Sequence, residues 1–180
     1  GPSGPGWSLR YHGTAGFTVT ADQTTVVLDP FVSRPGLLST AFRRLRPNAE
    51  LVRRVFPVAD AVLVGHSHHD HILDAPEVCL HTGAQFVGSP DAAHVARAAG
   101  VDASRIIELE GAEELNIGPA RIRSIPSRHG RVYLNRVPLP GRITSKPEWP
   151  PRVWNLPHGL VLNWLVDVGG IRMVHIDSAD

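Results

Sequence analysis

Four side chains that commonly bind metal ions lie within six residues of one another. The segment Gly65-His-Ser-His-His-Asp-His71 contains His66, His68, Asp70 and His71, and it follows a short apolar run. Neutral imidazole nitrogens and carboxylate oxygens are ligands that zinc prefers, and a catalytic zinc site combines three protein ligands with water. Two histidines one residue apart can face a single ion from an extended loop, while Asp70 and His71 could face a second ion. The spacing therefore predicts a metal centre for one or two ions.

Apolar runs on both sides of this cluster predict the strands that position it. Residues 58–64 are apolar without alternation, which is typical of a strand covered on both faces, and the end of such a strand carries its loop to the rim of a sheet. The first two and the last two of the expected strands form hairpins, the last across Gly169-Gly170. The expected strands are residues 16–20, 24–29, 58–64, 84–88, 105–109, 120–125, 160–168 and 171–177.

Helix signals fall between the central strands, so a sheet with helices on its outside is expected. Asp74, with Glu77 three residues later, predicts a capping box at the start of a helix that ends at Gly83. Ser89-Pro90 predicts the start of a second helix, which ends near Gly100. The segments without a period, which we expect to be irregular, are residues 31–57 and 130–158.

The composition excludes several classes of protein. The chain has 180 residues, of which 42% are hydrophobic and 19% charged, as in a globular domain. No apolar run approaches the roughly 20 residues of a transmembrane helix, and one cysteine, Cys79, cannot form an internal disulfide. A formal net charge of +1 gives no general reason to expect a nucleic-acid partner. Because residues 1–6 do not resemble a signal peptide, we expect a cytoplasmic location.

The pattern His-x-His-x-Asp-His after a strand resembles the signature of the metallo-β-lactamase superfamily. Residues 11–17, 27–31 and 59–66 are similar to the branch that contains the ascorbate-6-phosphate lactonase-like proteins and the N-acyl-phosphatidylethanolamine phospholipase D. The resemblance implies the α/β fold of this superfamily, an αββα sandwich, over residues 7–180, after a disordered or cloning-derived tail at residues 1–6. It also implies that only the N-terminal half is present, a mixed sheet with outer helices whose inward face lacks a partner layer. A second chain or a missing segment would complete the fold.

The same resemblance implies a set of metal ligands for two Zn²⁺ ions, with Mn²⁺ or iron as alternatives. A carboxylate that follows a late strand would bridge the two ions, and either Asp177 or Asp180 could supply it; we favour Asp180 because it lies clear of the strand. Asp29 would orient a ligand histidine by accepting its second N–H. The remaining second-site histidine is expected from outside this chain. The implied ligands are His66, His68 and His129 for the first ion, and Asp70, His71 and Asp180 for the second.

These implied roles predict a metal-dependent hydrolase. A metal-bound hydroxide would attack a lactone, an ester or a phosphodiester, and Asp70 would orient it or accept its proton. The arginines of residues 31–57, together with Arg128, could bind an anionic group, and the Pro- and Trp-rich residues 130–158 would suit an apolar or amphiphilic one. The expected partner is therefore a small anionic or amphiphilic molecule, which His12 and His158 could also contact.

Two other functions stay open at this point. The first is a non-catalytic module whose metal stabilises the fold, favoured by the unusual ending His175-Ile-Asp-Ser-Ala-Asp180 and by the absent second half. The second is a nuclease, since the superfamily includes nucleases. A near-neutral charge and the lack of a surface pattern of aromatic and basic residues argue against a nuclease.

Overall fold

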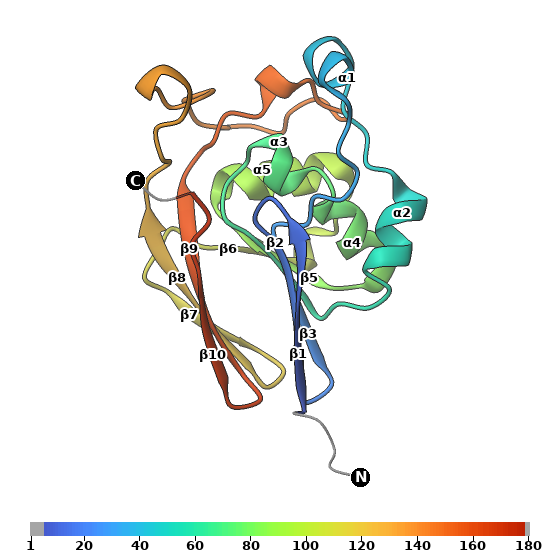
Figure 1. Cartoon of the computed structure of the whole chain (residues 1–180), viewed down its shortest axis with the longest axis vertical. Helices are drawn as coiled ribbons and strands as arrows, with labels where there is room; N and C mark the ends of the chain where they lie inside the picture. The colour runs from blue at the N-terminus through green and yellow to red at the C-terminus, as the bar shows by residue number, and fades with distance from the viewer. Residues whose placement is uncertain (1–5, 179–180) are drawn as a thin grey trace.

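The computed structural model describes residues 6–178, and its strands form two sheets that face one another (Figure 1). The strands are β1 (Trp7–Gly13), β2 (Gly16–Ala21), β3 (Thr24–Leu28), β4 (Ala61–Val64), β5 (Gln85–Gly88), β6 (Ile106–Glu108), β7 (Glu114–Ile117), β8 (Ala120–Ser127), β9 (Val161–Val168) and β10 (Ile171–His175). The first sheet has the order β1-β2-β3-β4-β5-β6, antiparallel from β1 to β3 and parallel from β3 to β6. The second sheet, β10-β9-β8-β7, is antiparallel throughout.

Both predicted hairpins are confirmed, β2 with β3 and β9 with β10, and the central strands lie where the apolar runs indicated. Two strands, β1 and β7, were not expected. Most residues of β1 are exposed, and β7 has four residues of which one is buried. Such short or solvated strands carry little of the hydrophobic alternation by which a strand is recognised.

Five α-helices lie in the described residues: α1 (Leu37–Phe42), α2 (Ala49–Val55), α3 (His69–Ile72), α4 (Ala75–Thr82) and α5 (Pro90–Ala99). Helices α4 and α5 end as predicted at glycines in the left-handed region, Gly83 with φ 82° and Gly100 with φ 97°. None of the helices in the described residues is long and apolar enough to cross a membrane.

The expectation that residues 31–57 are irregular was wrong, because α1 and α2 lie there. Neither helix presents a periodic apolar face: no residue of α1 is buried, and in α2 only Val52 is buried. Helix α2 instead begins with a side-chain cap, in which Asn48 Oδ1 accepts the Leu51 N–H at 3.1 Å. Hydrophobic periodicity could not reveal helices this short.

The capping box predicted at Asp74 was also wrong. Asp74 precedes α4, but its side chain makes no cap hydrogen bond. Its Oδ2 accepts the backbone N–H groups of Val32 and Ser33 at 2.6 and 2.8 Å, so the buried carboxylate ties the loop after β3 to α4. A carboxylate accepts hydrogen bonds from the donors that the tertiary fold places beside it, and here these donors are backbone N–H groups of a loop that is distant in sequence.

The core has two layers. On the outer face of the first sheet, Val62, Phe86 and other strand residues pack against α2, α4 and α5. On its inner face, Leu28 and Leu63 pack against Ile122 and Trp164 of the second sheet. The expectation that this inner face lacks a partner layer was therefore wrong, since β7 to β10 supply it.

The loops that carry the histidines and aspartates of interest leave both sheets at the same end of the strands (Figure 1). Asp29 follows β3 and His66 follows β4, and these two strands are parallel. His129 follows β8 and Asp177 follows β10, which run in the same direction because each is antiparallel to β9. The Leu162 N–H donates to the Gly65 carbonyl at 2.8 Å and joins the two sheets beside these loops.

Residues 130–158 cross over this end of the sheets (Figure 1). They are held there by Asp91, a fully buried carboxylate at the start of α5. Its oxygens accept the Arg142 Nε–H at 2.8 Å, the Ile143 N–H at 2.5 Å and the Leu160 N–H at 3.1 Å. The Ser67 hydroxyl adds a second tie by donating to the Pro157 carbonyl at 2.9 Å. The irregular segment is thus fixed in place although it has little regular structure.

Replacing Asp91 with asparagine is expected to destabilise the chain. The amide would turn an NH₂ group toward a backbone N–H that now donates to the carboxylate, and it would remove the charge that pairs with Arg142. We expect the free energy of unfolding, measured by urea denaturation, to fall by about 2–4 kcal/mol. The control is Asp102→Asn, because exposed Asp102 caps a short turn through the Ser104 N–H and asparagine caps equally well. Equal losses in both variants would contradict the anchoring role of Asp91.

Candidate metal centre

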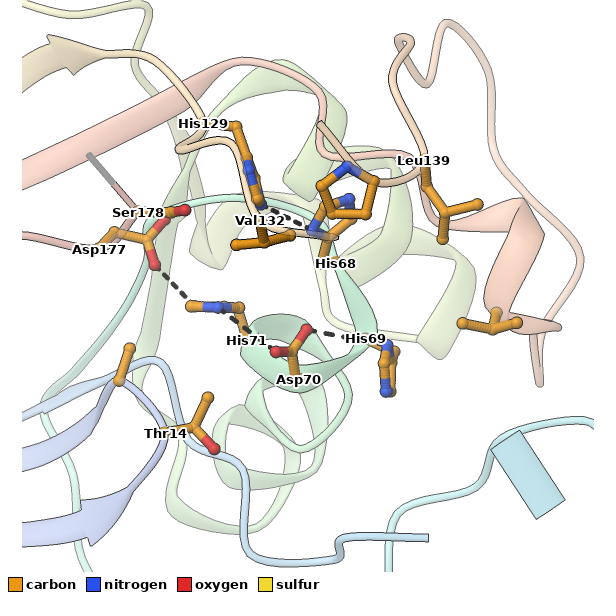
Figure 2. Close-up of a pocket in the computed structure, with 13 residues that line it drawn as sticks. Thr14, His68, His69, Asp70, His71, His129, Val132, Leu139, Asp177 and Ser178 are labelled. Atoms are coloured by element: carbon orange, nitrogen blue, oxygen red, sulfur yellow. Dashed lines mark hydrogen bonds and ion pairs between the residues drawn. The ribbon is translucent and has the colours of Figure 1, made fainter. Parts of the chain in front are cut away.

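Three histidine rings from two sheets turn their nitrogens toward one point. His66 Nε2 lies 2.9 Å from His68 Nδ1, and His129 Nε2 lies 3.1 Å from the same nitrogen. Figure 2 shows His129 and His68 approaching each other across the top of the pocket. His66 is fully buried and His68 nearly so. Three imidazole nitrogens within 4.8 Å of one another form a ligand set of the kind that holds a divalent cation.

The proton positions leave lone pairs facing one another in this group. His66 Nδ1 donates to Asp177 Oδ2 at 2.5 Å, and His129 Nδ1 donates to the Gly130 carbonyl at 2.7 Å. A neutral imidazole carries one N–H, so Nε2 of both His66 and His129 is a lone pair directed at His68. A proton on His68 Nδ1 could satisfy only one of them. A cation at this point would satisfy all three nitrogens, and the residues therefore fit a metal ion.

The second half of the cluster is formed by His71 between two buried carboxylates. His71 Nδ1 lies 2.6 Å from Asp177 Oδ1 and 3.3 Å from Asp29 Oδ2. These carboxylates favour a proton on Nδ1, and Nε2, which lies 3.8 Å from Asp70 Oδ2, would offer a lone pair once His71 is neutral. Both Asp29 and Asp177 side chains are fully buried, whereas the Asp70 side chain is 36% exposed. Asp70 and His71 thus offer an oxygen and a nitrogen at the open side of the cluster.

Burial keeps His66 and His68 uncharged. It lowers the pKa of His68 to about 3, with His66 and His129 acting in the same direction. The pKa of His66 is also far below its ordinary value, through burial and then through the charge of His71. Burial alone would lower the pKa of His71 as well, but Asp177 and Asp29 raise it well above its ordinary value. His66 and His68 are therefore neutral at neutral pH, which is the form in which histidine binds a metal, whereas a metal at His71 Nε2 would displace a proton.

Asp177 reaches the cluster because the residue it packs against is Gly65. A Cβ at position 65 would collide with the Asp177 carboxylate, so only glycine leaves room for this side chain beneath the histidines. The backbone of Asp177 is held by its N–H, which donates to Asn163 Oδ1 at 3.0 Å. The Gly65 N–H donates to Asp29 Oδ1 at 2.8 Å, so Gly65 also positions the second buried carboxylate.

The structure brings most of the residues singled out in the sequence to one place. His66, His71 and Asp177 form a second group of possible ligands that shares His66 with the first. Asp180 lies outside the described residues, so only Asp177 of the two alternatives is described at the site. His12 lies elsewhere, since its ring packs on Phe56 and bonds to Thr18. The residues brought together are His66, His68, Asp70, His71, His129 and Asp177.

A cavity of about 510 Å³ opens beside Asp70 and His71 (Figure 2). Its far wall is apolar and comes from residues 130–158, with Val132 and Leu139 facing the histidines. This volume lies within the range of about 300–1,000 Å³ that is usual for small-molecule sites. The apolar residues of this wall are Val132, Pro138, Leu139 and Val153.

The arginines of residues 31–57 do not line this cavity, contrary to the role considered for them. Arg44 pairs with Glu148 at 2.6 Å and Arg53 with Glu77 at 3.0 Å. Arg34 donates to the backbone carbonyl of His12. These three side chains bind other parts of the chain, and none of them lines the cavity. Basic side chains that sequence reasoning did not single out, Arg131 and Arg142, lie closer to the histidines, in a second cavity.

The stability of the metal-free protein is expected to fall on both sides of about pH 6.5, the ordinary pKa of histidine. Below pH 6.5, His66 and His68 bind protons in the unfolded state but not in the folded state, because folding lowers their pKa values. The stability therefore falls as the pH drops. Above pH 6.5, His71 keeps its proton only in the folded state, so its contribution is lost as the pH rises through its folded pKa.

Urea denaturation at a series of pH values measures both effects. His68→Gln is expected to reduce the acid slope by at most about 1.4 kcal/mol per pH unit, the value for one proton. His71→Gln is expected to flatten the alkaline side. Unchanged slopes in both variants would contradict these protonation states.

Comparison with known proteins identifies the family of this chain. Residues 24–175 match the family described as the Beta-lactamase superfamily domain. A UPF0173 metal-dependent hydrolase of Methanopyrus kandleri is 36% identical over 110 residues, which are 61% of this chain and 39% of that protein. One of Desulfitobacterium hafniense is 26% identical over 125 residues, 69% of this chain and 47% of that protein. The chain thus spans less than half the length of these curated relatives.

Solved structures share the fold at low sequence identity. Igni18, a metallo hydrolase of Ignicoccus hospitalis, superposes with a TM-score of 0.55 at 18% identity, over 96% of this chain and 60% of that one. CmlA, a diiron β-hydroxylase of Streptomyces venezuelae, gives a TM-score of 0.59 at 19% identity, over 98% of this chain and 30% of that one. Because the family match covers residues 24–175, most of its length, the chain belongs to the metallo-β-lactamase superfamily.

Proposed function

We propose that this chain carries the metal centre of a metal-dependent hydrolase. The observation that supports it most is the convergence of His66 Nε2, His68 Nδ1 and His129 Nε2, two of which present lone pairs to the third. Such a group is unfavourable without a cation and favourable with one. The curated relatives are themselves named metal-dependent hydrolases, which agrees with the proposal.

In this proposal, five of the six clustered residues would bind two ions. The three converging histidines would hold the first ion, and Asp70 with His71 would contribute to the second. Asp177 contacts Nδ1 of both His66 and His71, so it would orient these two rings, and the bridging carboxylate remains the one expected at Asp180. Zinc suits this mixture of nitrogen and oxygen ligands, and manganese or iron would fit it as well.

A divalent cation held here would acidify a coordinated water and polarise the carbonyl or phosphoryl oxygen of a substrate. The chain's own contribution begins with Asp70, which borders the cavity. Burial tends to raise the pKa of Asp70, but His71 and His69 lower it below the ordinary value, so the side chain is ionised at neutral pH. As an ionised acceptor, Asp70 can orient a water molecule and take up its proton. Asp29 keeps His71 in one orientation through Nδ1.

The cavity favours a lactone, ester or phosphodiester that carries an apolar part. Val132, Leu139 and Val153 line the same cavity as Asp70, and these apolar side chains would bury an apolar group while the bond to be cleaved lies at the histidines. Asp91 and Ser67 hold the segment that carries these side chains, so the apolar wall is formed before a substrate binds.

The main alternative is a module whose metal only stabilises the fold. Structural zinc sites are closed by four protein ligands, whereas catalytic sites keep an open position. The cavity of about 510 Å³ reaches Asp70, His71 and His129, so the centre lies open to a small molecule. This openness favours a hydrolase over a structural site.

Removing one ligand of the first group is expected to abolish tight metal binding. His68→Ala leaves two nitrogens facing an empty point, and we expect metal affinity to fall about 100-fold or more. Competition with a chromophoric chelator measures the affinity, and a panel of lactones, esters and phosphodiesters measures hydrolysis. The control is His94→Ala, because His94 is a partly buried histidine on α5 that belongs to neither group of possible ligands.

The two readouts separate the possible failures. Metal affinity equal in His68→Ala and His94→Ala would show that the ligand assignment is wrong. Tight metal binding by the unaltered chain without hydrolysis of any substrate in the panel would contradict the hydrolase and favour the stabilising module.

A further inference from the structure

A second cavity, of about 330 Å³, shares His129 with the first. His129 lines both cavities, and His158, whose ring centroid lies 5.6 Å from that of His129, lines the second. We propose that this second cavity binds an oxyanion, a phosphoryl or carboxylate group of the substrate, through Arg128, Arg131 and Arg142. The inference rests on the proposed function, because it assigns the cavity to the substrate of the same metal centre.

The charge of the second cavity is unbalanced. Its lining contains three arginines and two histidines, and no carboxylate of the described residues lines it. Neither Arg128 nor Arg131 forms an ion pair with any carboxylate that the structure describes, whereas Arg142 pairs with Asp91. Like charges gathered around one concave surface repel one another, and a bound anion would remove that repulsion.

A third cavity, on the second sheet, gives a comparison in which surface arginines pair with carboxylates. It is lined by Arg121, Arg123 and Arg172 together with two carboxylates. Arg121 lies 2.6 Å from Glu114, and Arg172 lies 2.7 Å from Asp167. The number of arginines is the same in the two cavities, but only the lining of the third contains carboxylates that pair with them.

Arg142 is held in a defined position. Its Nε–H donates to both oxygens of the buried Asp91, at 3.0 and 2.8 Å. The two terminal nitrogens of the guanidinium are left for another acceptor, and a planar fork of this kind suits phosphoryl and carboxylate oxygens. Arg128 directly precedes His129, so an anion bound at Arg128 would lie close to a residue that also borders the metal centre.

Geometry therefore divides the substrate between the two cavities. The apolar part would lie against Val132 and Leu139 in the first cavity, and the anionic group would lie in the second. The bond to be cleaved would fall between them, at the histidines. This division predicts a substrate with an apolar end and an anionic end, rather than a neutral ester.

The test uses inorganic phosphate and acetate as probes of the two anion classes. Their affinities are measured by isothermal titration calorimetry on metal-loaded protein at low and at physiological ionic strength, with metal content determined in the same samples. In the double variant R128Q/R131Q, we expect the affinity for the preferred anion to fall about tenfold per arginine, as for other charged hydrogen bonds. The matched control is R121Q/R123Q, which removes two arginines of the third cavity and should bind the anion as the unaltered chain does.

The outcomes separate the inference from the proposed function. Anion bound only by the metal would give equal affinity in R128Q/R131Q and the unaltered chain, and this result would overturn the inference. Equal losses in the two double variants would also overturn it, because they would reflect net charge alone. Preference for phosphate or for acetate identifies the anion class, and either supports the inference. An unaltered chain that takes up no metal would contradict the proposed function, whatever its affinity for phosphate.

Discussion

Burial of neutral histidines with lone pairs facing one another is the constraint on which the site depends. Protein interiors rarely leave buried polar atoms unpaired, because each such atom costs free energy. Here His68 Nε2 is buried without a hydrogen-bond partner among the described residues, and Asp29 Oδ2 and Asp177 Oδ1 meet His71 Nδ1 in ion-pair contacts that are not aligned as hydrogen bonds. Several atoms without an aligned hydrogen bond in one cluster indicate that the sequence is adapted to a positive charge that links them. The metal centre and the surrounding fold are therefore coupled.

The sheets supply the rigidity that such a cluster needs. Ligands come from the ends of strands in both sheets, so packing of Leu63 against Trp164 also fixes the distance between His66 and His129. Gly65 is the point of closest approach: it leaves space for Asp177, donates to Asp29 and accepts from Leu162. The covering segment is then held by Asp91. Each anchoring contact is long-range in sequence, as expected for a site assembled by tertiary structure.

Sequence reasoning succeeded where the signal was local. The His-x-His-x-Asp-His spacing, the hairpins and the caps of α5 depend on neighbouring residues, and the structure has these elements where they were expected. Sequence reasoning failed where a side chain's partner lies far away in the sequence. Asp74 was expected to cap a helix but accepts from Val32 and Ser33. The inner face of the first sheet was expected to be uncovered. This expectation failed because apolar alternation shows that a strand has a buried face but not which strand pairs with it or packs on it. The proximity of Asp177 depends on Gly65, which lies more than a hundred residues away.

Anomalous X-ray diffraction from crystals of the metal-loaded protein, recorded at the zinc and iron absorption edges, tests the central claim most directly. The account predicts a peak within about 2.0–2.3 Å of His66 Nε2, His68 Nδ1 and His129 Nε2. It also predicts a second peak near Asp70 and the Nε2 atom of His71. Anomalous peaks elsewhere, with the three nitrogens still facing one another without a cation, would contradict it.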